Sequence, residues 1–159
     1  MARIVFSVFI ILCFLFLGEK KTRQLKDKLN FIEDYRKFVC ELESAIRCVK
    51  KNMFEFFCFS NFKPPLIEHL ITNKSKDINE AIKTFKSTQE EEQIVKIIAP
   101  ALAFAQKSSD VKGISGALLH AQEMLCEYQN ELKRELGGKI KTTPYLYFLV
   151  GVFVAVIII

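Results

Sequence analysis

The chain has 159 residues, with 23 basic and 18 acidic side chains and a formal net charge of +5. So small a positive excess argues against nucleic-acid binding and favours a role in membrane orientation. With only six glycines and no tryptophan, a glycine-rich phosphate-binding loop is not expected. The five cysteines contain no Cys-x-x-Cys pair, which favours free thiols in a reducing compartment over a disulfide framework or a zinc site.

The beginning of the chain is apolar. The run Ile4–Gly18 carries no charge, and its length of about 15 residues also suits the apolar part of a signal peptide. No small-x-small cleavage site follows this run, and the basic residues Lys20 and Lys21 come soon after it. We therefore predict that residues 1–18 form an uncleaved N-terminal transmembrane segment, with a signal peptide as the alternative.

A long helix is expected next, over residues 20–58. Its apolar residues recur every seven positions, which predicts an amphipathic helix with an apolar face wide enough for a bundle. One series is Leu25, Ile32, Val39, Ile46 and Met53, a second is Tyr35, Leu42, Val49 and Phe56, and Phe31, Phe38 and Ala45 widen the face. At about 1.5 Å per residue, such a helix would exceed about 50 Å.

Shorter helices are expected between residues 64 and 107. Pro64 or Pro65 can begin a helix whose apolar residues are Leu66, Ile67, Leu70 and Ile71. Two residue pairs with the spacing of a capping box predict two further helix starts. These pairs are Asp77 with Glu80 and Thr88 with Glu91. Pro100 is expected to break or kink the second of these helices.

A last long helix should begin at Ser109 or Asp110, since either side chain can cap its first turn. Its heptad series are Val111, Leu118, Leu125 and Leu132, and Ile114, Ala121 and Tyr128. The pair Gly137-Gly138 should terminate or loosen this helix. No segment alternates with a period of two, so no sheet is expected. The predicted fold class is all-α: a helical bundle with two long helices and several short ones, flanked by N- and C-terminal transmembrane helices.

The end of the chain is apolar again. The segment Thr142–Ile159 is uncharged and just reaches the length that a spanning helix needs. Pro144 suits the first turn of that helix, and Tyr145 and Tyr147 suit the level of the lipid headgroups. We therefore predict a C-terminal transmembrane segment over residues 142–159, which leaves residues 19–141 as the interior domain.

Basic residues flank both apolar segments on the side of the interior domain. They are Lys20, Lys21, Arg23, Lys26 and Lys28 after the first segment, and Lys133, Arg134, Lys139 and Lys141 before the second. Only Arg3 and the terminal amine lie on the other side. The positive-inside rule then places the interior domain in the cytosol and both chain termini across the membrane.

The sequence contains little that suggests chemistry. His69 and His120 are the only histidines, and neither has a partner at metal-ligand spacing. Cys58 with His69 remains open as a nucleophile and base pair, while carboxylate pairs such as Glu33-Asp34 are interpreted as solvated faces. We predict no catalytic, cofactor-binding or metal-binding residue and no enzymatic activity. A cluster of phenylalanines is expected to pack in the core, with a partner-binding surface as the alternative. The cluster is Phe54, Phe56, Phe57, Phe59 and Phe62.

Several short stretches, together with this layout, resemble the stage III sporulation protein AB family of endospore-forming bacteria. The stretches are Arg23-Gln24-Leu25, Leu42-Glu43-Ser44-Ala45-Ile46, Pro65-Leu66, Ser108-Ser109-Asp110, and the basic-to-apolar tail Lys139–Ile159 with Gly151. The resemblance covers nearly the whole chain and depends more on the layout than on any one stretch. It implies a helical domain similar to the cytosolic domains of type II secretion platform proteins.

The resemblance also implies a function. The chain would be a non-enzymatic platform component of the sporulation channel complex that links mother cell and forespore. It would lie in the cell membrane on the mother-cell side of the forespore septum, with its interior domain in the cytosol. Expected partners are other membrane proteins of the channel, a cytosolic ATPase of the complex, the lipid bilayer, and further copies of the chain. The alternative is a stand-alone membrane tether or lipid-surface interaction protein, based on the lysines beside the membrane.

Overall fold

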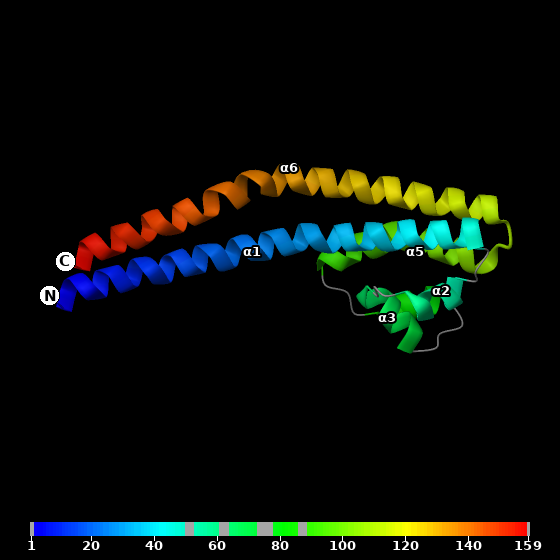
Figure 1. The fold of residues 1–159 in the computed structure, drawn as a ribbon, viewed down its shortest axis with the longest axis horizontal. Helices are drawn as coiled ribbons and strands as arrows, with labels where there is room; N and C mark the ends of the chain where they lie inside the picture. Colours follow the sequence, from blue (N-terminus) through cyan, green and yellow to red (C-terminus); the bar gives the residue numbers. More distant parts are fainter. Residues whose placement is uncertain (1, 50–52, 61–63, 73–77, 86–88, 159) are drawn as a thin grey trace. The chain divides into compact units, whose positions relative to one another are not determined.

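The computed structural model describes residues 2–49, 53–60, 64–72, 78–85 and 89–158, and every element in these ranges is helical (Figure 1). The elements are α1 (Ala2–Ser44), the π-helix η1 (Ala45–Val49), α2 (Met53–Phe59), α3 (Pro65–Thr72), α4 (Ile78–Thr84), α5 (Gln89–Lys107) and α6 (Val111–Ile158). The expected all-α class is therefore confirmed for the described part of the chain.

The chain divides into two compact units. The hairpin unit consists of Met1–Asn30 and Asn130–Ile159, and the bundle unit consists of Phe31–Gln129. The long helices α1 and α6 each contribute to both units, so no helix end marks the limits at residues 18 and 141 that the charge pattern suggests. The hairpin unit contains one arm of each long helix, and the bundle unit contains the remaining elements.

The bundle unit has a core of large apolar side chains, and most of the expected heptad positions lie in it. On α1 and the elements after it, Ile32, Tyr35, Phe38, Val39, Leu42, Ile46 and Met53 are buried, and on α6 Ile114, Leu118, Ala121 and Leu125 are buried. Leu25, Phe31, Ala45, Phe56, Val111, Tyr128 and Leu132 are half-buried. The 3.6-residue periodicity of the apolar positions therefore identified the buried faces of both long helices.

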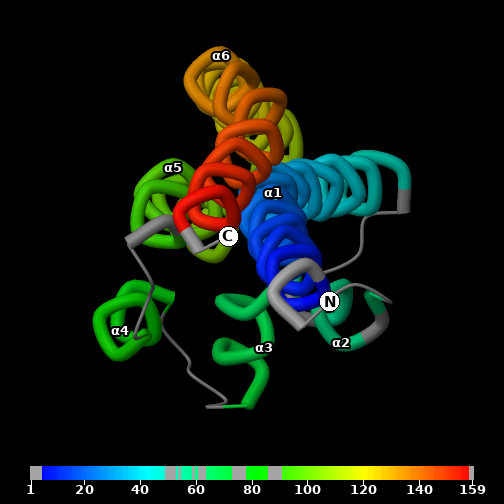
Figure 2. The backbone as a smooth tube through the Cα atoms, turned by 90° about the vertical axis from the view of Figure 1, so that its left-hand side faces the viewer, coloured from blue at the N-terminus to red at the C-terminus, as the bar shows by residue number. Residues whose placement is uncertain are grey.

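The short helices α2, α3 and α4 lie on one side of the bundle part of α1, and α6 lies on the other (Figures 1 and 2). As expected, α3 begins at the prolines: Pro65 is its first residue, and the carbonyl of Pro64 accepts hydrogen bonds from the Ile67 and Glu68 amides at 2.8 and 3.0 Å. Leu66, Ile67 and Leu70 are buried. Asp77 and Thr88, the expected caps of the next two helices, lie outside the described residues.

The expectation of one helix over residues 20–58 is wrong at both ends. The helix α1 already begins at Ala2, and its α-helical part ends at Ser44, where η1 follows. The phenylalanine cluster explains why the chain does not continue as one straight helix to residue 58. The rings of Phe38 and Phe57 have centroids 5.8 Å apart, whereas a straight helix would separate these residues by about 28 Å. Phe57 is fully buried, so the chain folds back to bring this part of the cluster into the core.

At three further places where a helix boundary was one expected outcome, the helix continues. Pro100 lies inside α5, and Gly137-Gly138 and Pro144 all lie inside α6. Two glycines cost a helix only about 1 kcal/mol each. The hydroxyls of Thr142 and Thr143 donate to the carbonyls of Gly138 and Lys139, so the turn before Pro144 has additional hydrogen bonds. The predicted termination at Gly137-Gly138 and the first-turn position of Pro144 are therefore wrong.

The beginning of α6 is fixed by Asp110, one of the two expected caps. Its carboxylate accepts hydrogen bonds from the amides of Lys112 and Gly113, each at 3.1 Å. A Cβ atom on Gly113 would lie 2.9 Å from the Asp110 carboxylate and 3.4 Å from the Phe104 ring. Glycine at this position therefore leaves room for the cap.

Candidate membrane interface

Small side chains form the contact between the two arms of the hairpin unit. Ser7 and Gly18 on α1, and Gly151 and Ala155 on α6, are buried although they lie within apolar segments. Each contributes little side-chain volume, so the two helix backbones can approach closely. Small residues at helix contacts are typical of helix pairs in membranes, where close van der Waals packing favours association.

The close approach is sharpest at the two glycines. A Cβ atom on Gly18 would lie 3.0 Å from the Cβ of Tyr147, and one on Gly151 would lie 2.9 Å from the Cβ of Phe14. As α1 advances from residue 14 to residue 18, its partner on α6 therefore moves back from residue 151 to residue 147. This order establishes an antiparallel pair whose opposed residue numbers add up to 165.

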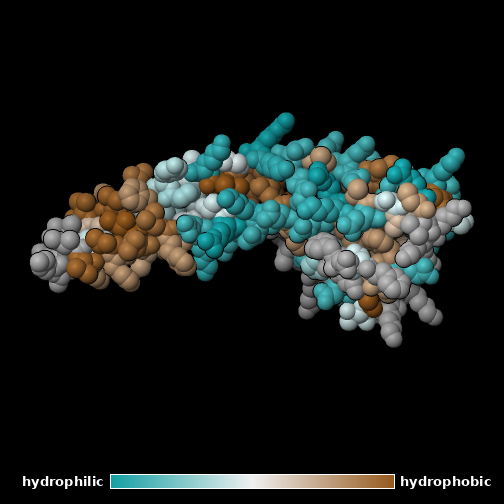
Figure 3. All heavy atoms as spheres, in the orientation of Figure 1, coloured by the Kyte–Doolittle hydropathy of each residue, from teal (hydrophilic) through white to brown (hydrophobic). Residues whose placement is uncertain are grey.

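The outward faces of the same two arms carry large apolar side chains. On α1 the exposed ones are Val5, Phe6, Val8, Phe9, Leu12, Leu15, Phe16 and Leu17, and on α6 they are Tyr145, Leu146, Phe148, Leu149, Val150, Phe153, Val156 and Ile157. Brown spheres dominate this end of the hairpin unit in the hydropathy view (Figure 3). The hairpin therefore has small residues inside and bulky apolar residues outside, as expected of a protein surface in contact with lipid.

Within the described residues, α6 is the helix that is long and apolar enough to cross a membrane, and its apolar stretch is mostly exposed. The arm of α1 does not reach the same standard, because the charged residues Glu19, Lys20 and Lys21 follow Gly18 directly. The structure thus supports the coarser expectation of one possible membrane-spanning helix.

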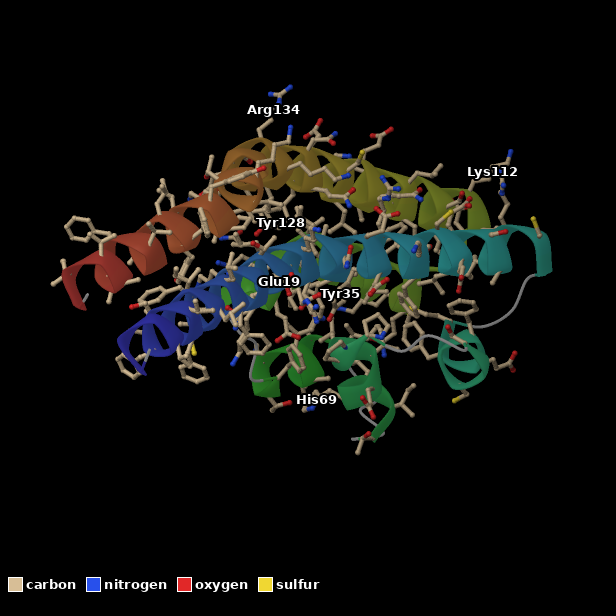
Figure 4. The ribbon with its side chains drawn as sticks, turned by 60° about the vertical axis from the view of Figure 1, so that its left-hand side comes forward. Glu19, Tyr35, His69, Lys112, Tyr128 and Arg134 are labelled. Atoms are coloured by element: carbon tan, nitrogen blue, oxygen red, sulfur yellow. The ribbon has the colours of Figure 1, made fainter. Side chains whose placement is uncertain are left out.

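A band of charged residues adjoins the apolar faces of the hairpin unit. Between residues 19 and 28 and between residues 133 and 141 the chain carries nine basic and three acidic side chains. Two of the acids are already paired, Glu19 with Arg23 at 3.6 Å and Glu135 with Lys139 at 3.2 Å. The side chain of Arg134 projects away from α6 (Figure 4). This band gives the hairpin unit a strongly positive end.

In the bundle unit, two glutamates on α1 connect it to α6. Glu33 accepts hydrogen bonds from Gln129 at 2.8 Å and from Arg36 at 3.1 Å, and Arg36 in turn lies 3.7 Å from the sulfur of Cys126. The interpretation of Glu33-Asp34 as a solvated face therefore needs correction for Glu33. Its partner Gln129 is distant in sequence and is itself buried.

Glu43 repeats this arrangement ten residues later on α1. It accepts a hydrogen bond from the Ser115 hydroxyl of α6 and pairs with Arg47 at 3.3 Å. Its side chain is only 8% exposed, although the heptad pattern assigns it to the charged face. Buried charged groups that are fully paired can fix the register of two helices. We infer that the glutamate contacts set the alignment of α1 and α6 within the bundle unit.

Tyr35 is the buried polar side chain at the centre of the bundle unit. Its hydroxyl oxygen accepts a hydrogen bond from the Leu66 amide at 3.4 Å, which satisfies a donor in the first turn of α3. Figure 4 shows Tyr35 on the side of α1 that faces the short helices. Burial raises the pKa of the Tyr35 hydroxyl well above its ordinary value, the Leu66 hydrogen bond opposes this rise, and the Glu91 carboxylate adds to it.

The two histidines and Cys58, which the sequence analysis considered for chemistry, have the following surroundings. His69 Nε2 lies 3.2 Å from the Thr84 hydroxyl, and its ring lies 5.4 Å from that of Phe85, whereas the Cys58 thiol is exposed. His120 lines a groove of about 490 Å³ between α5 and α6, together with apolar residues such as Met124. Among the described residues, no group of three or more histidine, cysteine or acidic side chains could hold a metal ion.

Comparison of the chain with protein-family models, with curated proteins and with solved structures gives no match. The geometry is therefore the only basis for a functional assignment beyond the sequence resemblance.

Sequence reasoning missed two features of these sites. The first is the small-residue contact, for which the pattern Gly151-x-x-x-Ala155 was an available signal. The second is the pairing of Glu43 with Ser115, which lie 72 positions apart and give no local signal.

Proposed function

We propose that the chain is a non-enzymatic membrane platform component of the channel complex that links mother cell and forespore in sporulating bacteria. The observation that carries the membrane part is the outward placement of sixteen large apolar side chains on the hairpin arms, eight on each. The platform part is based on the resemblance to the stage III sporulation protein AB family and its helical domain.

The cost of leaving these side chains in water supports the membrane assignment. Keeping one Leu, Val or Phe exposed instead of buried forgoes roughly 1.5–3 kcal/mol. The sixteen side chains are between 36% and 71% exposed, so the sum is on the order of 20 kcal/mol. A bilayer around the hairpin removes this cost.

In this proposal both arms cross the membrane, although the apolar run of α1 is the shorter one. The contacts of Gly18 with Tyr147 and of Phe14 with Gly151 hold the α1 arm against the α6 arm. A crossing α6 would therefore take α1 with it. The α1 arm would be covered on one side by α6 and on the other by lipid.

In this proposal the bundle unit lies in the cytosol, and the positive band supports this side by the positive-inside rule. There the bundle unit would hold other membrane proteins of the channel and a cytosolic ATPase of the same complex. The groove between α5 and α6, lined by Ile97, Pro100, Ala117 and Met124 among others, is a surface where a helix of such a partner could pack.

Three measurements test the proposal. Reporter fusions at residue 60 and at the C-terminus should report the cytosol and the opposite side of the membrane, respectively. Affinity purification of the full chain from sporulating cells should co-isolate other channel subunits, and the protein should appear only during spore formation. Constitutive expression without co-isolating subunits would remove the platform role, and an external bundle unit would remove the topology.

The alternative is a stand-alone membrane tether. The observation that favours it is the set of exposed lysines in the positive band, since each lysine near an anionic surface contributes about 1 kcal/mol of attraction. In that case the protein would purify from sporulating cells without any channel subunit and would still locate to the membrane.

A further inference from the structure

We infer that four lysines of the positive band form a two-helix binding site for the headgroups of anionic phospholipids. These four, here called the lysine collar, are Lys20, Lys21 and Lys26 on α1 and Lys141 on α6. The inference rests on the membrane insertion of the hairpin and is independent of the platform role.

The first argument is the availability of the four lysines. All four are exposed, and within the described part of the chain none of them takes part in an ion pair, in contrast to Arg23 and Lys139. Asp27 is the one acidic residue of the band outside those pairs. The collar therefore retains a net positive charge that the protein itself does not neutralise.

The second argument is the level at which the lysines lie. Extending the antiparallel order of the Gly18–Tyr147 contact by six residues puts Lys141 near Gln24, between Lys21 and Lys26 of the other helix. The three lysines of α1 span about 9 Å along the helix axis, at about 1.5 Å per residue. Cations from both helices thus occupy one band, close to the thickness of a headgroup layer.

The third argument is the continuity of the collar with the apolar faces. Leu17 and Tyr145 are exposed within one turn of the lysines, on α1 and α6, and Tyr145 lies level with Lys20. Lysine side chains at such a boundary extend their ammonium groups into the headgroup layer while their methylene groups remain in contact with the acyl chains. The position therefore specifies lipid phosphates, rather than nucleic acid or a soluble anion.

The distribution of charge over the protein favours anionic lipid over zwitterionic lipid. The hairpin unit has ten basic and four acidic residues, whereas the bundle unit has thirteen basic and fourteen acidic residues. The positive charge of the chain is thus concentrated where the membrane surface lies. Anionic headgroups attract such a cluster, and zwitterionic headgroups with no net charge do not.

The test uses the full chain reconstituted in vesicles of equal parts phosphatidylglycerol and phosphatidylcholine. After extraction in mild detergent, native mass spectrometry measures the ratio of the two lipids that remain bound. We expect phosphatidylglycerol to be enriched, and the enrichment to be lost when Lys20, Lys21, Lys26 and Lys141 are all replaced by Gln. Replacement of the same four by Arg should preserve the enrichment, which separates charge from loss of folding.

A matched control removes the same charge elsewhere. Replacing Lys37, Lys83, Lys107 and Lys112, which are exposed in the bundle unit, by Gln should leave the enrichment unchanged. An equal loss in this control, or retained enrichment in the collar variant, overturns the inference. If millimolar inorganic phosphate displaces the lipid while sodium chloride of equal ionic strength does not, the site binds free phosphate and the lipid assignment is wrong.

Discussion

The hairpin unit and the bundle unit differ in which residues lie buried between their long helices. In the bundle unit, large residues such as Phe38, Leu42 and Leu118 are buried and most of the described charged residues are exposed. In the apolar parts of the hairpin arms, residues 5–18 and 142–157, the buried residues are small and most large apolar residues are exposed. The same two helices, α1 and α6, follow both rules along their lengths. The difference is the one expected if lipid surrounds the hairpin arms and water surrounds the bundle unit.

The largest difference should come from replacing one leucine in each unit by alanine. Leu118 is fully buried, so Leu118→Ala should destabilise the bundle unit by about 2–5 kcal/mol. Leu149 is 61% exposed on the hairpin, so Leu149→Ala should leave the bundle unit unaffected. Urea unfolding of the full chain in micelles, followed by circular dichroism, measures both. Similar losses in the two variants would mean that the two units do not differ in this way.

Replacing a small residue by a large one tests the close contact between the two arms of the hairpin unit. Gly151→Leu should separate the arms at a cost of about 1–3 kcal/mol, because the added Cβ alone would lie 2.9 Å from Phe14. Gly138→Leu is the control, since no atom lies within 4 Å of its added Cβ. Pulsed electron paramagnetic resonance between labels at Cys13 and at a Val154→Cys substitution, with the other cysteines replaced by Ser, reports the separation. An unchanged distance in Gly151→Leu would contradict the tight contact.

A third substitution tests the glutamate contacts of the bundle unit. Glu43→Ala removes the acceptor of the Ser115 hydroxyl and the partner of Arg47, and we expect a loss of about 1–3 kcal/mol. Glu41→Ala changes an exposed carboxylate on the same helix and should cost little. A double-mutant cycle with Ser115→Ala isolates the coupling across the two helices, and a coupling energy near zero would remove the register role of Glu43.

The smallest effect concerns Tyr35. Tyr35→Phe removes the acceptor of the Leu66 amide and should cost about 1 kcal/mol. Folding raises the pKa of this hydroxyl above its ordinary value of 10.0. When the pH exceeds 10.0, the unfolded chain therefore releases a proton that the folded chain retains. Stability should therefore fall as the pH rises beyond that value, and this part of the fall should be absent in Tyr35→Phe. Thermal unfolding measured on both proteins between neutral and alkaline pH decides the point.

Local sequence patterns predicted much of the fold. The heptad positions Ile32, Val39 and Leu118 are buried as expected, because the period of an α-helix determines which residues share a face. The start of α3 at Pro65 and the cap at Asp110 also followed from local rules. These rules act within one or two turns, where residue type and spacing are sufficient.

The remaining features depended on partners that are distant in the sequence. The helix α6 continues through Gly137-Gly138, since a local cost of about 1 kcal/mol per glycine is small beside tertiary packing. The burial of Glu43 depends on a serine 72 positions away. The return of α2 to α1 depends on the contact between Phe38 and Phe57. A single sequence contains no measure of such pairings, so the candidate sites were less predictable than the helices.

The contact at Gly18 and Gly151 constrains how the chain can change over evolutionary time. Any side chain larger than hydrogen at these positions would collide with Tyr147 or Phe14, whereas the outward positions can exchange one bulky apolar residue for another without a steric penalty. Descendants of this sequence should therefore vary widely on the outward side and retain small residues along a single stripe. In distant relatives, the spacing of these small residues should therefore be retained better than the identity of the apolar residues.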